Sequence, residues 1–119
     1  MNFAKILFVA VAFAAGIATG QEKAPAGSVE RGKRLYVELG CYSCHGTHGQ
    51  GGGRGSEPKI LPPLFPWEGF LAQMRKPRQE MPAYIEKWTS LQDVADIYAY
   101  LLALPKSPAA KDIGKLKDF

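Results

Sequence analysis

The stretch Cys41-Tyr42-Ser43-Cys44-His45 contains both cysteines of this 119-residue chain, so all thiol chemistry is concentrated there. Two cysteines separated by two residues are compatible with a disulfide, a thiol redox pair or part of a metal site. A zinc site needs a second pair of cysteine or histidine ligands, and no such pair is left in the sequence. A thioredoxin-like redox pair needs a βαβ context, whereas this motif follows a predicted helix and precedes a glycine-rich loop.

His45 directly follows the second cysteine and favours a different interpretation. The pattern C-x-x-C-H is the attachment signature of c-type haem. Its spacing lets the thiols reach the vinyl groups of one porphyrin and form thioethers, and the next residue then lies beneath the ring, where its imidazole can bind iron. The motif therefore predicts one haem c, attached covalently through Cys41 and Cys44, with His45 as an axial ligand of the iron.

Three side chains are candidates for the ligand on the other face of the ring. His48 follows His45 too closely for the chain to cross the porphyrin, so we expect a loop histidine there. Met74 falls in a predicted helix, where its spacing suits a core face. Met81 precedes Pro82, and proline favours a rigid, non-helical loop able to point a thioether inward. We expect Met81 to bind iron, with Met74 and an iron lacking a second protein ligand as the alternatives.

The N-terminal residues resemble a secretory signal peptide. Lys5 is followed by the apolar run 6–17, and Ala18-Thr19-Gly20 places small residues where a signal peptidase cleaves. The apolar run is shorter than the roughly 20 residues that span a bilayer, so we expect cleavage near Gly20 and no integral membrane span afterwards. The sequence therefore predicts residues 1–20 as a signal peptide and a periplasmic location.

Length and charge limit the remaining chain to one small domain. We expect a short linker over 21–27, a single domain over 28–105 and a polar tail over 106–119. A domain of this size often needs a staple, a metal or a cofactor for stability. The chain has 15 Lys+Arg against 11 Asp+Glu, without a long basic run or a nucleic-acid motif, so nucleic-acid binding is not expected.

Capping residues and apolar periodicity predict three helices and no strand of useful length. Ser28 caps a helix over 29–39, which ends at Gly40. A second, short helix covers 67–76. Ser90 begins a capping box for a helix over 91–104, and Pro105 stops it; the ranges and caps are all read from residue type and spacing.

Gly32 predicts how the first and last of these helices meet. Glycine costs about 1 kcal/mol relative to alanine inside a helix, so its presence there indicates a close backbone approach by another element. We expect the last helix to cross the first one at Gly32, with Tyr36 and Tyr100 near the contact.

Several motifs together resemble the monohaem class I cytochromes c over roughly residues 28–104. They are Gly32 with Tyr36, Cys41-Tyr42-Ser43-Cys44-His45-Gly46, Gly49-Gln50-Gly51, Pro62-Pro63-Leu64, Met81-Pro82 and Asp96-Ile97-Tyr98-Ala99-Tyr100-Leu101. The resemblance implies an all-α fold of three to four helices wrapped around one covalently attached haem, with crossing N- and C-terminal helices. It also implies His45 and Met81 as axial ligands, a hydrogen bond from the other His45 nitrogen to the Pro62 carbonyl, and Leu64 packed on the ring.

Such a centre is expected to transfer single electrons between redox partner proteins of the periplasm, a dehydrogenase or an oxidase, and not to act as an enzyme. A thioether ligand favours Fe(II) and raises the reduction potential. Two alternatives are a fixed electron-accepting subunit of a dehydrogenase complex and a haem enzyme or sensor with an open iron position. The basic cluster Arg75, Lys76 and Arg78 has three possible roles: steering an acidic partner, pairing with a haem propionate, or forming a solvated loop.

Overall fold

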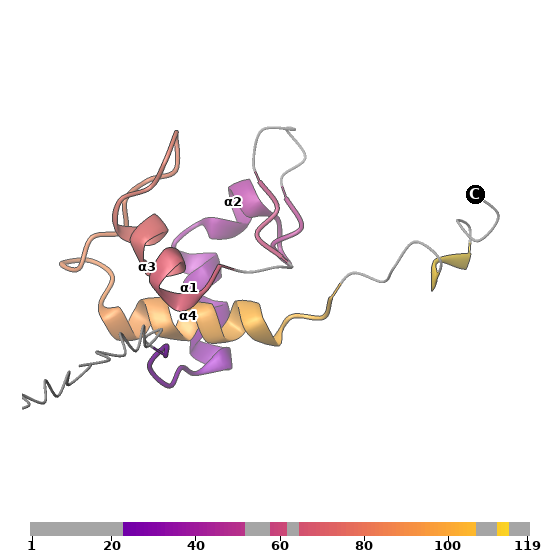
Figure 1. The fold of residues 1–119 in the computed structure, drawn as a ribbon, viewed down its shortest axis with the longest axis horizontal. Helices are drawn as coiled ribbons and strands as arrows, with labels where there is room; N and C mark the ends of the chain where they lie inside the picture. The colour runs from indigo at the N-terminus through magenta and orange to yellow at the C-terminus, as the bar shows by residue number, and fades with distance from the viewer. Residues whose placement is uncertain (1–22, 52–57, 62–64, 107–111, 115–119) are drawn as a thin grey trace, which may run out of the picture.

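The computed structural model describes residues 23–51, 58–61, 65–106 and 112–114, and within those ranges the fold is entirely helical. The four helices are α1 (Val29–Glu38), α2 (Cys41–His45), α3 (Trp67–Arg75) and α4 (Leu91–Ala103). In Figure 1, α4 crosses α1 near its middle, while α2 and α3 lie on one side of α4. The all-α fold with N- and C-terminal helices in contact is confirmed.

The helix ends follow the capping signals of the sequence. The Ser28 hydroxyl accepts a hydrogen bond from the Arg31 amide, and Leu39 ends α1 one residue earlier than expected. Ser90 and Asp93 form the predicted reciprocal capping box of α4, which ends at Ala103 instead of residue 104. Helix ends of this kind fray, so the differences of one residue have no structural consequence.

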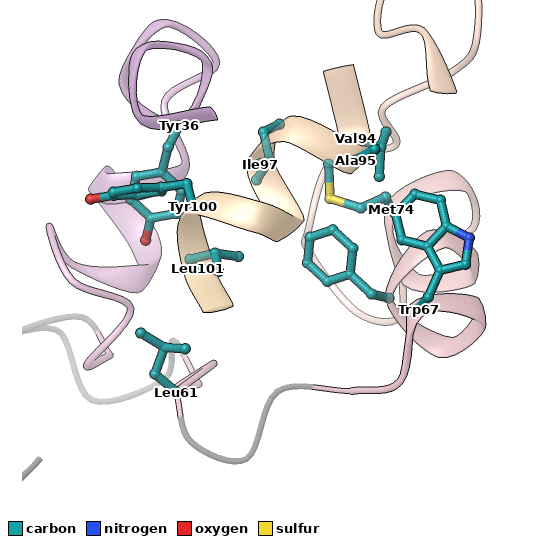
Figure 2. Close-up of a cluster of buried hydrophobic side chains, with 10 residues drawn as sticks. Tyr36, Leu61, Trp67, Met74, Val94, Ala95, Ile97, Tyr100 and Leu101 are labelled. Carbon is teal, nitrogen blue, oxygen red and sulfur yellow. The ribbon is translucent and has the colours of Figure 1, made fainter. Parts of the chain in front are cut away.

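α1 and α4 touch backbone to backbone at Gly32, as the sequence predicts. A Cβ atom added to Gly32 would lie 1.9 Å from the carbonyl oxygen of Asp96 and 2.9 Å from the Cβ of Tyr100. The rings of Tyr36 and Tyr100 pack against each other with centroids 5.5 Å apart. Figure 2 shows the two side chains next to each other. A second glycine, Gly27, makes the same kind of approach, because its Cβ would lie 2.3 Å from the carbonyl oxygen of Ala95.

A buried carboxylate fastens the start of α1 to α4. Asp96 is 2% exposed, and its Oδ1 accepts hydrogen bonds from the Ser28 amide at 2.8 Å and from the Gln92 side chain at 2.9 Å. The Arg31 guanidinium forms ion pairs with both Asp96 and Asp93. Burial acts to raise the pKa of Asp96, but the hydrogen bonds and Arg31 together lower it below its ordinary value.

α3 completes the core by packing its apolar face on α4. Trp67, Phe70 and Met74 are buried, and Figure 2 shows Trp67 and Met74 beside Val94 and Ala95. Met74 therefore lies in the core, where the sequence interpretation placed it. The predicted signal peptide at 1–20, with Gly20, lies outside the described residues, as do most of the tail and both Pro62 and Leu64.

The close contact predicts a strong asymmetry between two glycine-to-alanine substitutions in helices. Gly32→Ala forces α1 and α4 apart and should lower the free energy of unfolding by about 1–3 kcal/mol. Gly69→Ala in α3 should be neutral or stabilising, by up to about 1 kcal/mol, because its nearest neighbour is a side-chain atom of Phe65 at 3.6 Å. Chemical denaturation of both variants measures the difference, and equal stability of the two would contradict the helix contact.

The lowered pKa of Asp96 predicts an acid-sensitive contribution to stability. Its folded pKa lies below the unfolded value of about 3.9, so the contribution is complete above that value and is lost as the pH falls through the folded pKa. Asp96→Asn should cost about 1.5–3 kcal/mol at neutral pH and flatten the acid side of the stability profile. The matched substitution at the exposed Asp112 should leave the profile unchanged. An unaltered acid limb in Asp96→Asn would show that the carboxylate does not fasten the helices.

Candidate haem site

The helix α2 presents the two thiols and the imidazole of the motif on neighbouring positions. Residues three and four apart lie on the same side of a helix, so Cys41 is flanked by Cys44 and His45. Gly40 and Gly46, with φ of 75° and 77°, take left-handed backbone conformations at the two ends of this short helix. No disulfide joins the two cysteines, and Cys44 is exposed while Cys41 is half-buried. The motif therefore forms a short helix, and the chain changes direction at the glycine on each side of it.

The tyrosines of the helix crossing hold the segment that follows His45. The Tyr36 hydroxyl donates a hydrogen bond to the Gly46 carbonyl at 2.7 Å, and the Tyr100 hydroxyl donates one to the Thr47 carbonyl at 3.3 Å. Burial raises the pKa of Tyr36, so its hydroxyl keeps its proton and remains a donor at neutral pH. The contact between α1 and α4 thereby fixes the position of α2.

The surroundings of Cys41 affect the ionisation of its thiol. Burial raises the pKa of the Cys41 thiol, although the Tyr84 hydroxyl, with 4.0 Å between its oxygen and the sulfur, opposes that effect. Redox-active C-x-x-C motifs work through a thiol whose pKa is lowered, because the thiolate is the nucleophile. The shift at Cys41 is opposite in direction to the one found in such redox motifs.

His45 is held in one tautomer by a backbone carbonyl. Its Nδ1 lies 2.9 Å from the carbonyl oxygen of Pro58, and since a carbonyl can only accept, Nδ1 must donate. Nε2 then carries the free lone pair with which imidazole binds a metal. The acceptor expected from the sequence was the carbonyl of Pro62, which lies outside the described residues. The structure shows the same kind of bond with Pro58 as the acceptor.

Met81 lies in a non-helical segment, as expected, and the residue is half-buried. The Gln73 side-chain amide donates a hydrogen bond to Met81 Sδ at 3.5 Å. A thioether sulfur has two lone pairs, so one remains for a metal. His48 is exposed and its Nδ1 lies 2.9 Å from the Thr47 hydroxyl oxygen, in agreement with a loop histidine. The imidazole and the thioether fit the axial donor set of a c-type haem.

The segment that carries Met81 is fastened to α3 by Arg75. The Arg75 guanidinium donates hydrogen bonds to the carbonyls of Tyr84 at 2.5 Å and Thr89 at 2.7 Å, and it pairs with Glu86. The Tyr84 amide adds a hydrogen bond to the Met74 carbonyl at 2.9 Å. Arg75 thus binds the polypeptide itself, which separates it from its neighbours in the basic cluster, Lys76 and Arg78; both of these are exposed.

Gln79, two residues before Met81, has a left-handed backbone conformation. Gln79 has a φ of 59°, a conformation that side-chain-bearing residues adopt at a cost of about 1–2 kcal/mol. Such strain persists only where the surrounding structure determines the backbone, so the backbone conformation at Gln79 is set by its surroundings.

The described residues contain no other candidate metal centre. No group of three or more histidine, cysteine or acidic side chains within them could hold an ion. A cavity of about 380 Å³ is lined by Lys33, Tyr36, Val37, Tyr42, Thr47, His48 and Tyr100, a lining that does not include the two cysteines, His45 or Met81. Within the described part of the chain, no helix has the length and apolar character of a membrane span.

The role of Arg75 leads to a prediction about the Met81 segment. Arg75→Gln removes donors to two carbonyls and should cost about 1–3 kcal/mol locally, so amide hydrogen exchange over residues 79–90 should accelerate. Arg78→Gln, a matched substitution at an exposed position, should leave exchange unchanged. The two variants are compared by mass spectrometry of peptides from this segment. Equal protection in both would mean that Arg75 does not hold it.

The sequence of this chain is similar to those of known cytochrome proteins. Residues 27–101 match the family described as cytochrome c oxidase, cbb3-type, subunit III. The chain is 32% identical over 83 residues to the cytochrome bc1 complex cytochrome c subunit of Corynebacterium diphtheriae; the match covers 68% of this chain and 29% of that relative. No solved structure matches. Members of the matched family are typically electron carriers, and a cytochrome c domain implies a covalently bound haem c. The chain therefore belongs to the cytochrome c family, in the group of the cbb3-type oxidase subunit III.

Proposed function

We propose that this protein carries single electrons through a haem c that is attached by thioethers to Cys41 and Cys44 and ligated by His45 and Met81. The observation that carries the proposal is that each of the two candidate iron ligands is held by a hydrogen bond, His45 by the Pro58 carbonyl and Met81 by Gln73 of α3. The haem, when bound, supplies an iron that changes oxidation state by one electron. The chain supplies the ligands and the surroundings that keep them in place.

The two parts of the chain that carry the proposed ligands His45 and Met81 are held by contacts that do not involve the iron. Pro58 orients the His45 ring, and Arg75 fixes the segment of Met81. Ligands held in this way keep their positions when the charge on the iron changes, which lowers the rearrangement that accompanies electron transfer. The contacts expected for Pro62 and Leu64, with the imidazole and the ring, stay predictions.

Two protein ligands leave no iron position for a substrate, and this supports a carrier over an enzyme. A peroxidase or a gas sensor needs an open position on one face of the ring. The Gln73 amide favours an iron with ligands on both faces, because its hydrogen bond holds the Met81 sulfur next to α3. The alternative with an open iron requires Met81 to point elsewhere.

The partners of such a carrier are redox proteins on the outer side of the cytoplasmic membrane. The signal-like residues 1–20 support export, and we propose a periplasmic location with no membrane span after cleavage. The relative named above is a subunit of a bc1 complex, and this chain spans 29% of its length. A second candidate function is therefore a subunit fixed within a dehydrogenase or oxidase complex. Native purification separates the two, because a fixed subunit elutes with a larger partner and a free carrier elutes alone.

Substitution of the two methionines tests the ligation directly. Met81→Leu should abolish the far-red absorption of thioether-ligated ferric haem and lower the reduction potential, since the soft ligand that favours Fe(II) is gone. Met74→Leu is the matched control: Met74 is buried in the core, where this swap costs less than about 1.5 kcal/mol and should leave both properties unchanged.

The proteins for this test are the exported holoproteins, with a visible spectrum recorded during a redox titration. Mass spectrometry of the same samples should show one covalent haem per chain. Loss of the far-red band in Met74→Leu and its survival in Met81→Leu would refute the assignment of Met81. Absence of a covalent adduct would refute the proposal as a whole.

A further inference from the structure

We propose that Gln73 is a positioning residue of the redox centre: its side-chain amide hydrogen-bonds the Met81 sulfur, raises the reduction potential and fixes which lone pair of that sulfur faces the iron. This inference rests on the proposed function, because it assumes that Met81 is an axial ligand. It adds a residue that no sequence motif marks. Gln73 lies on α3, outside every stretch that carries the resemblance to cytochromes c.

The position of Gln73 follows from the register of α3 and the Met81 segment. Met74, the next residue of the helix, accepts a hydrogen bond from the Tyr84 amide at 2.9 Å, and Arg75 binds the Tyr84 carbonyl. Three consecutive residues of α3 therefore contact the segment 81–84, and the first of these contacts is the one to the sulfur. The Gln73 side chain is half-buried, so water competes only in part for its amide.

The chemistry of sulfur explains why this contact affects the potential. An amide is a donor, and a thioether accepts only through a lone pair. A hydrogen bond on one lone pair withdraws electron density from the sulfur and weakens its donation through the other. Fe(III) depends on that donation more than Fe(II) does, so the hydrogen bond stabilises Fe(II) relative to Fe(III). Hydrogen bonds to sulfur ligands are one of the means by which proteins tune redox centres.

The same contact selects one configuration at the ligand. The two lone pairs of a thioether between different substituents are not equivalent, and iron can bind through either. With the amide of Gln73 on one of them, the other is left for iron, so a single ligated form is expected. Without the donor, two forms that differ in the orientation of the Met81 methyl group become accessible.

The test compares substitutions at Gln73 with one at its neighbour, in the exported holoprotein. Gln73→Leu removes the donor and keeps the surroundings apolar, and Gln73→Ala removes it with minimal disturbance of the helix. Ala72→Leu places the same leucine at the adjacent, exposed position of α3. The measurements are the reduction potential and the NMR signals of the Met81 methyl group, which an iron ligand shifts far from the others.

Both Gln73 variants should keep the far-red band and lose at least three-fold in the equilibrium preference for Fe(II), or about 30 mV at about 59 mV per tenfold change for one electron. Their Met81 methyl signal should broaden or split, and Ala72→Leu should match the parent. Parental potential and signals in both Gln73 variants would overturn the inference, as would an equal shift in Ala72→Leu. Absence of the far-red band from the parent protein would instead refute the ligation by Met81, and with it the proposed function.

Discussion

The backbone contact of α1 with α4 at Gly32 is the constraint on which the rest of the structure depends. It brings Tyr36 and Tyr100 together, and their hydroxyl groups then hold the carbonyls that directly follow His45. A side chain at position 32 would separate the helices and move both hydrogen-bond donors. The haem motif itself is only a five-residue helix between two glycines, so its orientation comes from these longer elements.

The second half of the site depends on a different set of contacts. α3 packs on α4 through its apolar face (Figure 2). The last residues of α3 bind the segment that carries Met81. Arg75 holds the carbonyls of Tyr84 and Thr89, and Gln79 has a left-handed backbone conformation near the start of this segment. The two proposed axial ligands, His45 and Met81, thus lie in separately supported parts of the protein. This arrangement suits a centre whose iron changes charge while its ligands stay in place.

Residue type and local spacing predicted the parts of this structure that are local. The caps at Ser28 and Ser90, the helical position of Met74 and the contact at Gly32 follow from rules that operate within a few residues. The roles of Asp96, Arg31 and Arg75 did not follow, because each depends on partners in other elements. Asp96 and Ser28 are 68 positions apart, and no periodicity connects them. Arg75 read as one member of a basic cluster, whereas its partners are mostly backbone carbonyls, which have no sequence signature.

The candidate site also has parts that the sequence predicted and parts that it did not. The motif at Cys41, Cys44 and His45 is readable because the chemistry of attachment fixes both spacing and residue type. The acceptor of the His45 hydrogen bond is a backbone group, so its identity depends on the path of a loop. In the structure that path brings Pro58 to the imidazole, and Pro62, the acceptor implied by the resemblance, lies outside the described residues. Gln73 was not singled out for a similar reason, since a glutamine on a helix is usually a solvated residue.

The coordination of the iron is the point at which this account is tested most directly. X-ray absorption at the iron edge of the exported, oxidised holoprotein counts the neighbours of the metal by element. The account predicts one sulfur neighbour beside the nitrogens of the porphyrin and of one histidine. A shell made up of nitrogen and oxygen only, or an iron that lacks a sixth neighbour, would contradict it.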